Sequence, residues 1–205
     1  MTIDDPLSLW DYRRRVQEQY RRVRATGVGD SSWRRWRSDR DHLFATHTQS
    51  PIEIERRGND AGLPFFPYDP AWRIEAIVAP VEPVPMPAAH SADGATPLIR
   101  FASVSFPPPF GSETLELSLY WTDVYGGGVF LPFRDGTNGD ETYGGGRYLL
   151  DSIKGADLGS ADDRVVLDFN FAYHPSCVYS DRWSCPLAPP ENQLAAAVRA
   201  GERLA

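Results

Sequence analysis

The stretch Thr114-Leu115-Glu116-Leu117-Ser118-Leu119-Tyr120-Trp121 alternates leucines with polar or aromatic side chains, and this alternation decides the fold class. Successive side chains of a strand point to opposite faces, so the three leucines would face a core while Glu116 and Ser118 would face away from it. A strand with one buried and one wet face is typical of an antiparallel sheet.

Strands of similar character are predicted on both sides of this stretch, separated by turns rich in glycine, proline and aspartate. They cover residues 73–79, 98–106, 128–133, 147–150 and 164–169. No helical pattern separates the later runs, so we expect an antiparallel meander that curls toward a barrel. Residues 80–97 contain five prolines, which predicts a surface excursion with one short strand near Val84.

Two helices are predicted before the strands. The first is indicated by an apolar stripe spaced at three and four residues, namely Leu9, Tyr12, Val16, Tyr20 and Val23. Either Asp5 followed by Pro6, or Ser8, would cap this helix. A second helix is predicted from about Ser31 to Phe44.

We therefore expect an α+β fold in which N-terminal helices pack on a curled, mainly antiparallel β-sheet or partial barrel, followed by a long loop-rich C-terminal segment. A chain of 205 residues can bury roughly 70% of its unfolded surface as one domain. We expect a single domain over residues 1–205, with a helical segment at 1–46 and a β-rich body at 47–205. Residues 191–204 remain open between helix and strand.

The composition resembles that of soluble globular proteins. It is 41% hydrophobic and 24% charged, which argues against disordered, collagen-like and coiled-coil architectures. No run approaches the roughly 20 apolar residues of a membrane span, and residues 1–6 are acidic where a secretory signal would be basic. These features predict a cytoplasmic protein with no membrane partner.

The net charge of −7 is unevenly distributed. Residues 1–40 carry ten arginines against six acids, whereas the rest of the chain carries 22 acids against 11 bases. The arginines interleave with the apolar helix stripe, as on a solvated helix face, and the acidic body would repel a phosphate backbone. We therefore expect a small-molecule ligand and no nucleic acid, and the oligomeric state is open.

Longer motifs occur along most of the chain. In the N-terminal half they are Trp10-Asp11-Tyr12-Arg13, Ser50-Pro51-Ile52 and Gly62-Leu63-Pro64-Phe65-Phe66-Pro67. In the C-terminal half they are Phe130-Leu131-Pro132-Phe133-Arg134-Asp135, Glu141-Thr142-Tyr143-Gly144-Gly145-Gly146-Arg147-Tyr148-Leu149, Leu167-Asp168-Phe169-Asn170, Ala172-Tyr173, Cys185-Pro186-Leu187-Ala188-Pro189-Pro190-Glu191-Asn192 and Arg199-Ala200-Gly201-Glu202.

Together these motifs resemble the bacterial family catalogued as domain of unknown function 1684. The resemblance spans nearly the whole chain, and it implies no established activity. The family pattern has Asn at the position of His174, so a role that demands an imidazole there cannot be general to the family.

The polar hairpin between Arg134 and Arg147 is the first candidate for a binding site. Asn138-Gly139 supplies its turn, and the three glycines at 144–146 either relieve crowding or let the backbone approach a ligand. The candidate ligand-binding side chains are Arg134, Asp135, Glu141, Tyr143 and Arg147. Two guanidiniums can clamp a carboxylate or phosphate. Alternatively, Arg134–Asp135 and Arg147–Glu141 form surface ion pairs worth about 0–1 kcal/mol each.

Four polar side chains in the loops after residue 167 form the second half of the predicted site. Asp168 and Glu191 are the candidate catalytic groups for handling protons, and Asn170 and Asn192 are candidate ligand-binding residues. A base role requires burial that raises the carboxyl pKa toward the working pH. The alternative is that these side chains cap turns.

His174, Cys177 and Cys185 form a third candidate set, because zinc accepts soft ligands of this kind. The alternatives are that the cysteines are small buried side chains, or that Cys177 and His174 act as a nucleophile pair. No cofactor is otherwise predicted.

The leading hypothesis is a site for a small polar or anionic ligand between the Arg134–Arg147 hairpin and the Asp168–Asn192 loops, with catalysis left open. The second hypothesis is a structural or protein-interaction module whose polar motifs only hold the fold. The third is a domain stabilised by zinc through His174, Cys177 and Cys185.

Overall fold

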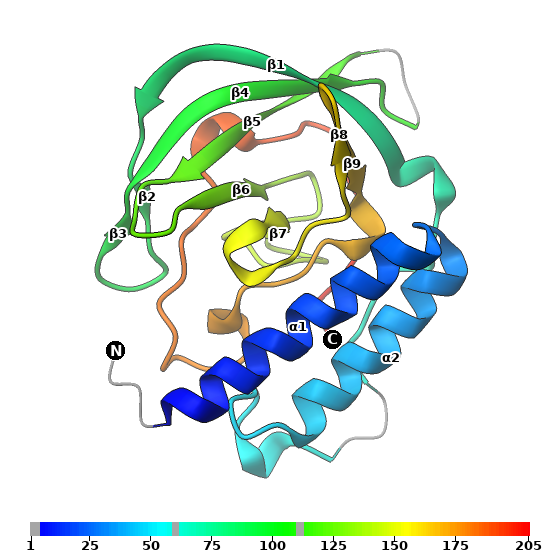
Figure 1. Cartoon of the computed structure of the whole chain (residues 1–205), viewed down its shortest axis with the longest axis vertical. Helices are drawn as coiled ribbons and strands as arrows, with labels where there is room; N and C mark the ends of the chain where they lie inside the picture. Colours follow the sequence, from blue (N-terminus) through cyan, green and yellow to red (C-terminus); the bar gives the residue numbers. More distant parts are fainter. Residues whose placement is uncertain (1–4, 59–61, 110–112) are drawn as a thin grey trace.

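The computed structural model describes residues 5–58, 62–109 and 113–205. Two long helices, α1 (Pro6–Thr26) and α2 (Asp30–Thr46), lie side by side against one side of a curved sheet (Figure 1). Asp5 caps α1 by accepting a hydrogen bond from Ser8 N at 3.0 Å, with Pro6 as the first helical residue. The first of the two predicted caps is therefore the correct one. Neither helix carries an apolar stretch long enough to cross a membrane.

The strands form one seven-stranded sheet and a separate small hairpin. The sheet contains β1 (Arg73–Pro85), β4 (Leu98–Phe106), β5 (Leu115–Thr122), β6 (Gly128–Phe133), β7 (Arg147–Asp151), β8 (Ser160–Ala161) and β9 (Arg164–Asp168). Its order is β7-β6-β5-β4-β1-β9-β8, and every neighbouring pair is antiparallel. The hairpin pairs β2 (Ala88–Ala89) with β3 (Ala95–Thr96). The predicted α+β fold with a curled antiparallel sheet is confirmed (Figure 1).

Strand β1 is longer than the sequence predicts, because it continues through a proline-rich stretch to Pro85. Beyond residue 77 it pairs with β4 and, within the described residues, no longer with β9, and the register with β4 shifts between Pro80 and Val84. Proline has no amide hydrogen to donate, and an edge position tolerates that loss. Of the surface excursion predicted for residues 80–97, only the β2–β3 hairpin and its flanking residues lie outside the sheet.

Two apolar cores lie on the two sides of the sheet. One fills the concave side, with Leu117, Leu131, Phe133, Phe169 and Val198 among its members. The other lies between the sheet and the helices, and includes Trp36, Tyr148 and Phe171. Trp33 Nε1 fastens α2 to this second core by donating to the Asn170 carbonyl at 2.8 Å. The helices thus cover an apolar face that would otherwise be open to water.

After β9, residues 169–205 run as loops and single 3-10 turns. The turns of the chain outside the sheet are η1 (Ile54–Arg56), η2 (Pro70–Trp72), η3 (Ser152–Lys154), η4 (Phe169–Phe171), η5 (Ser176–Val178) and η6 (Pro190–Asn192). After η6 the chain is extended, with isolated bridges from Gln193 to Arg134 and from Glu202 to Phe65. Residues 193–204 are neither a helix nor a strand of the sheet, which settles the segment left open above.

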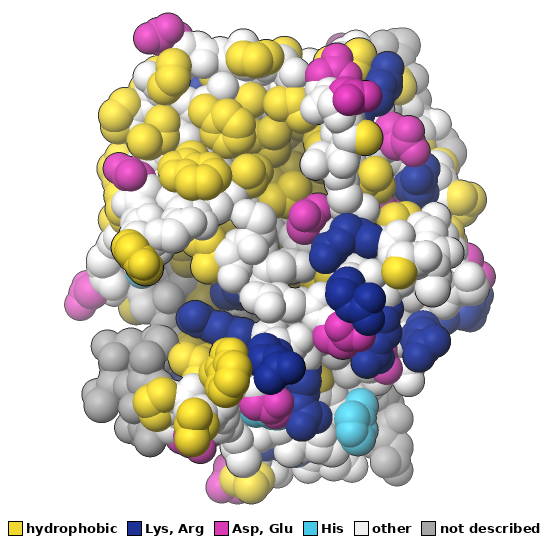
Figure 2. Space-filling view, viewed as in Figure 1, with side chains coloured by type: hydrophobic (Ala, Val, Ile, Leu, Met, Phe, Trp, Pro, Cys, Tyr) yellow, Lys and Arg dark blue, Asp and Glu magenta, His cyan; other side chains and the backbone are white. Residues whose placement is uncertain are grey.

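The arginines of the two helices lie among acidic side chains on the surface (Figure 2). Arg15 pairs with Asp11 at 2.7 Å, and Arg22 pairs with both Glu18 and Asp39. This arrangement matches the predicted solvated helix face.

Candidate functional site

Asp135 and Arg147, both predicted to bind a ligand, form a buried ion pair with each other. Arg147 Nη2 donates to Asp135 Oδ2 at 2.8 Å, and neither side chain is exposed. Asp135 Oδ1 accepts further hydrogen bonds from Thr137 N at 2.8 Å and Val198 N at 3.1 Å. Burial lowers the pKa of Arg147 although Asp135 acts to raise it. The pair therefore lies inside the protein and not at its surface.

The C-terminal segment occupies the space in front of the Arg147 guanidinium. Arg147 Nη2 also donates to the Val198 carbonyl at 2.8 Å, and Nη1 donates to the carbonyls of Ala200 and Glu202. The clamp that the sequence predicts for an anion thus holds three backbone carbonyls of the chain itself. The predicted Arg147–Glu141 pair does not form. Glu141 pairs instead with Arg199 at 2.8 Å on the surface.

The glycine run before β7 serves close packing. Gly146 has a φ of +97°, and a Cβ atom there would lie 2.5 Å from the Phe133 carbonyl oxygen. Any other residue would be strained and crowded at this position. Of the two predicted explanations for the three glycines, relief of crowding is the one that this position supports.

Arg134 and Tyr143 link the hairpin to the neighbouring loops through their backbones. Arg134 N donates to the Asn192 carbonyl at 2.8 Å, and its own carbonyl accepts from Leu194 N at 2.9 Å. Tyr143 N donates to His174 Nε2 at 3.2 Å. Burial raises the pKa of the Tyr143 phenol to about 12, so the hydroxyl stays protonated.

Asp168 and Asn170 fasten the aromatic loop that precedes β1. Asn170 Nδ2 donates to the Asp69 carbonyl at 2.8 Å, while Asn170 Oδ1 accepts from Asp69 N at 2.9 Å. Asp168 Oδ1 accepts from the backbone and side-chain nitrogens of Asn170 at 3.0 and 2.7 Å. The Asp168 side chain is fully buried, and this burial raises the pKa of its carboxyl to about 6. Asp168 thus has the raised pKa of a base without contact with solvent.

Asn192 is also fully buried, and its amide bonds to strands β5 and β6. Its Oδ1 accepts from Ser118 N at 2.8 Å, and its Nδ2 donates to the carbonyls of Ser118 at 2.9 Å and Pro132 at 2.8 Å. Ser118 is therefore buried, contrary to the wet face that the alternation predicts, because η6 covers it. Glu191 is exposed and accepts a 2.7 Å hydrogen bond from the Tyr120 hydroxyl of β5, and β4 and β1 lie between β5 and β9, the strand that ends at Asp168.

Glu202, which the sequence predicts only as part of a motif, is the centre of a second buried network. It accepts from Arg40 Nη2 at 3.0 Å, from His174 N at 2.9 Å and from the Tyr179 hydroxyl. Burial would raise the pKa of Glu202, but the Arg40 guanidinium lowers it below its usual value. The network connects α2 to the C-terminal end of the fold.

The predicted metal set is not assembled. His174 Nε2 accepts the Tyr143 amide hydrogen, and burial lowers the His174 pKa to about 4, so the imidazole stays neutral. Cys177 and Cys185 face each other instead. Within residues 5–58, 62–109 and 113–205, no three His, Cys, Asp or Glu side chains are grouped as metal ligands would be. The zinc hypothesis therefore has no site in this geometry.

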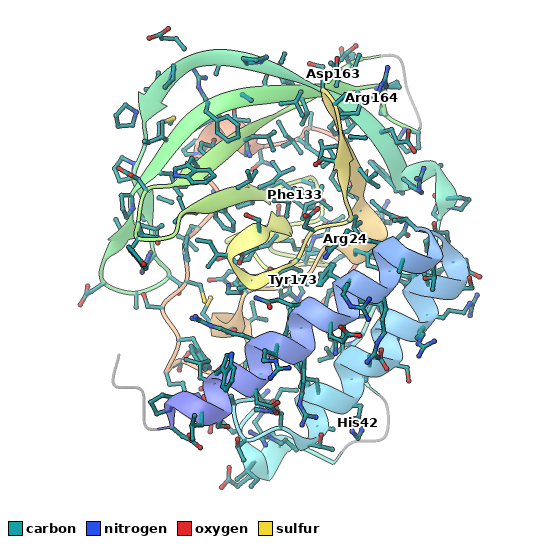
Figure 3. The ribbon with its side chains drawn as sticks, in the orientation of Figure 1. Arg24, His42, Phe133, Asp163, Arg164 and Tyr173 are labelled. Carbon is teal, nitrogen blue, oxygen red and sulfur yellow. The ribbon has the colours of Figure 1, made fainter. Side chains whose placement is uncertain are left out.

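A cavity of about 120 Å³ lies between the helices and the loop that carries His174. Its apolar walls come from α1, α2, the loop and the segments around residues 51 and 156, and they include Leu9, Tyr12, Val16, Phe44, Pro51, Ala156, Pro175 and Trp183. Arg13 and Lys154 are the exposed side chains at its rim. Figure 3 shows Tyr173, another lining residue, between α1 and β7. The sequence did not predict this cavity, although its loop belongs to the predicted site.

Four polar atoms of the cavity-lining side chains are buried without a hydrogen-bond partner among the described residues. They are Trp36 Nε1, Arg40 Nε, the Tyr173 hydroxyl and Trp183 Nε1. All four can donate a hydrogen bond, and buried donors are rarely left unpaired. Burial keeps Tyr173 protonated by raising its phenol pKa well above the usual value. The Arg40 guanidinium lies 4.2 Å from the Phe44 ring centroid and 5.1 Å from that of Tyr173.

A larger open groove of about 1100 Å³ follows the outer side of the helices. Its charged side chains include the Arg15–Asp11, Arg21–Glu18 and Arg22–Asp39 pairs, which already satisfy one another. The smaller cavity is therefore the better candidate site, because its donors are unpaired.

A model of the family described as a protein of unknown function, DUF1684, matches residues 60–203, more than half of the chain. The chain belongs to the DUF1684 family. An uncharacterised protein of Haloarcula marismortui, whose structure was solved by solution NMR, has 37% sequence identity with this chain, and the two structures match with a TM-score of 0.60. The match covers 85% of this chain and 93% of that protein. No curated protein matches this sequence.

The DUF1684 match contains the hairpin and the loops of the predicted site, but it begins after the two helices. The likeness to the Haloarcula protein extends further. Its 85% coverage is about 174 of the 205 residues, and only 146 residues remain from position 60 to the end. Part of the helical segment is therefore included in the structural likeness, and that segment supplies one wall of the cavity.

Proposed function

We propose that this DUF1684 protein binds a small carboxylate with an apolar body in the cavity between α1, α2 and the His174 loop. The observation that carries the proposal is the set of unpaired donors on Trp36, Arg40, Tyr173 and Trp183, whose side chains line a cavity together with aromatic and aliphatic ones. A ligand that supplies acceptor oxygens would satisfy these donors, and its apolar body would contact the aromatic and aliphatic walls.

The size of the cavity limits the ligand. An engineered cavity of about 150 Å³ accommodates benzene, so a space of this order suits one small ring or a short chain. The volume here is about 120 Å³, and ligands of nucleotide size would require the helices to move. Charge favours an anion through Arg13 at the rim, whereas Lys154 is paired with Asp151 at 2.9 Å.

The proposed cavity shares the C-terminal loops with the site predicted from the sequence, but it does not include the Arg134–Arg147 hairpin. His174, Pro175 and Ser176 belong to the predicted loop side and line the cavity. The hairpin side is replaced by the helices, because Arg147 is engaged by the C-terminal segment. The proposal assigns binding and no reaction.

Thermal unfolding with small carboxylate probes tests this function. Benzoate, phenylacetate and hexanoate, each at 10 mM, should raise Tm, whereas neutral benzyl alcohol should have a smaller effect. A ligand at 100 times its Kd stabilises the folded state by about 2.7 kcal/mol, which corresponds to roughly 5–10 °C for a chain of this size. A Tm unchanged by all three carboxylates would contradict the proposal.

Two variants locate the bound probe. Tyr173→Phe removes one unpaired donor, and Ala156→Leu fills part of the cavity, so both should reduce the Tm rise. Tyr125→Phe is the matched control, because Tyr125 is fully exposed and lies outside the cavity. Equal Tm rises in all three variants would mean that the probe binds elsewhere.

A further inference from the structure

Cys177 and Cys185 lie next to each other at a place that the proposed ligand site does not use. Cys177 is in η5, and Cys185 lies on the segment that pairs with the β2–β3 hairpin. Ser91 N donates to the Cys185 carbonyl at 2.9 Å, and Cys185 N donates to Ser91 Oγ at 3.2 Å. Both thiols are free and only partly buried. The Cys185 backbone is thus fixed to the β2–β3 hairpin, and its thiol is a hydrogen-bonding neighbour of Cys177.

Hydroxyl groups surround the Cys177 sulfur. Its Sγ lies 3.9 Å from the Tyr143 hydroxyl oxygen, and the Ser91 hydroxyl is a further neighbour. The hydrogen bond from the Cys185 thiol acts most strongly on Cys177, and with the Ser91 and Tyr143 hydroxyls it lowers the pKa of the Cys177 thiol to about 6. The same contact raises the pKa of Cys185, while Lys154 acts weakly in the opposite direction. Cys177 is the thiolate of the pair, and Cys185 carries the proton.

We propose that Cys177 and Cys185 form a peroxide-reactive dithiol that closes into a disulfide. The Cys177 sulfur lies beside the Tyr143 hydroxyl and in hydrogen-bonding contact with the Cys185 thiol, and the backbone of Cys185 is bonded to Ser91. Cys177 reacts first with a peroxide, and Cys185 then reacts with Cys177. This inference is independent of ligand binding in the cavity.

The chemistry balances with a peroxide as the oxidant. The Cys177 thiolate attacks one peroxide oxygen, the O–O bond breaks, and the leaving oxygen takes a proton to become water or an alcohol. Cys177 is then a sulfenic acid. Cys185 loses its proton, attacks the Cys177 sulfur and displaces hydroxide, which takes that proton to leave as water. Two thiols are oxidised, and one peroxide is reduced.

The first step prepares the second. The hydrogen bond to the Cys177 thiolate is the first cause that keeps the proton on Cys185, ahead of burial and of the charge on Cys177. A sulfenic acid is neutral, so this cause disappears as soon as Cys177 has reacted. Cys185 becomes a better nucleophile at the moment when its target forms.

Denaturing mass spectrometry of the reduced protein, before and after treatment with hydrogen peroxide at pH 7, tests the proposal. The expected product is about 2 Da lighter, is restored by dithiothreitol, and yields one peptide pair joined through Cys177 and Cys185. In Cys185→Ser, which keeps a hydroxyl beside Cys177, dimedone should trap a sulfenic acid on Cys177. In Cys177→Ser, Cys185 should remain unmodified.

Tyr143→Phe gives a second readout that does not depend on disulfide formation. In the Cys185→Ser background, loss of the phenol should slow alkylation of Cys177 by iodoacetamide at pH 5, about tenfold for each unit by which its pKa rises. Tyr125→Phe is the control and should leave the rate unchanged. The proposal is overturned if the native mass stays the same while the unfolded protein reacts, or if the only disulfide joins two chains.

Discussion

Arg147 and Asp135 meet at 2.8 Å with neither side chain exposed, and the remaining bonds of Arg147 go to backbone carbonyls of the C-terminal segment. A buried charge is costly unless it is paired and hydrogen-bonded, so the pair stabilises the fold only while residues 198–202 are in place. The polar motif of the hairpin therefore joins β7 to the far end of the chain.

Arg147→Met should destabilise the protein strongly. It leaves the Asp135 carboxylate buried without its ion-pair partner, and breaking a buried pair in this way typically costs about 3–5 kcal/mol. Urea unfolding followed by circular dichroism measures the change. Arg199→Met is the control, because the Arg199–Glu141 pair is on the surface and should contribute about 0–1 kcal/mol. Equal losses for the two variants would show that burial of the Arg147 pair is unimportant.

Asn192→Ala should destabilise the sheet by about 3 kcal/mol, because three bonds to the buried backbone of β5 and β6 are lost together. Glu191→Gln, at the exposed neighbouring position, should change the unfolding free energy by less than about 0.5 kcal/mol. Hydrogen exchange adds a local readout. The Ser118 amide should lose protection in Asn192→Ala and keep it in Glu191→Gln. Unchanged protection in both variants would contradict the assigned role of Asn192.

Tyr173→Phe and Tyr148→Phe should shift stability in opposite directions. The two rings contact each other at a centroid distance of 5.8 Å, but only Tyr148 has a partner for its hydroxyl, which donates to the Pro186 carbonyl at 2.6 Å. Removing a paired hydroxyl costs about 1 kcal/mol, whereas removing an unpaired buried one is neutral or stabilising. Thermal unfolding without ligand compares them. A loss of similar size in both would mean that the Tyr173 hydroxyl is bonded in solution.

The acid sensitivity of the fold should depend on His174. Burial lowers its pKa to about 4, compared with about 6.5 in the unfolded chain, so the unfolded state binds more protons between these values. Stability should therefore fall as the pH falls from about 6.5 to 4, by about 3 kcal/mol in total from this residue. His174→Asn removes the titrating group and can still accept the Tyr143 amide hydrogen. Urea unfolding at several pH values should show a flatter profile for this variant.

Asp168 should contribute in the opposite sense. Its pKa is raised to about 6 by burial, so the folded state binds more protons than the unfolded state between about pH 4 and 6. This contribution makes the fold less stable as the pH rises through that window. Asp168→Asn should remove it and make the acid-side loss caused by His174 steeper. If Asp168→Asn leaves the pH profile of unfolding unchanged, the carboxyl is not protonated preferentially in the folded state.

The strands could be predicted because each carries its own signal. The alternation in β5 and the turn glycines between strands act over a few residues, and the bounds of β4 and β6 agree with the prediction. β1 was predicted to be too short, because prolines were taken to end the strand. The sequence does not show that this part of β1 has a free edge, where proline is tolerated. The local sequence pattern was thus enough to predict most strands of the sheet. Which strand segments have an unpaired edge could be seen only in the three-dimensional structure.

The site could not be predicted to the same extent. The acceptors of Arg147 are backbone carbonyls 51 to 55 residues further along the chain, and a carbonyl has no signature in the sequence. Arg40 was part of an arginine-rich helix and was interpreted as solvated, although it is buried against Glu202. The cavity combines α1, α2 and a loop more than 120 residues later, so no local motif indicates it.

The position of the C-terminal segment also sets the order in which the molecule can be completed during synthesis. Residues 198–202 emerge from the ribosome after every strand of the sheet, yet their carbonyls are required to solvate Arg147 and their Glu202 is required by Arg40. Until they emerge, Arg147 has Asp135 but lacks its carbonyl acceptors, and Arg40 lacks Glu202. The strands of the meander can therefore pair during translation, but the native contacts of Arg147 and Arg40 form only after residue 202 has left the ribosome. A chain released before that point would be incompletely folded and open to chaperones and proteases.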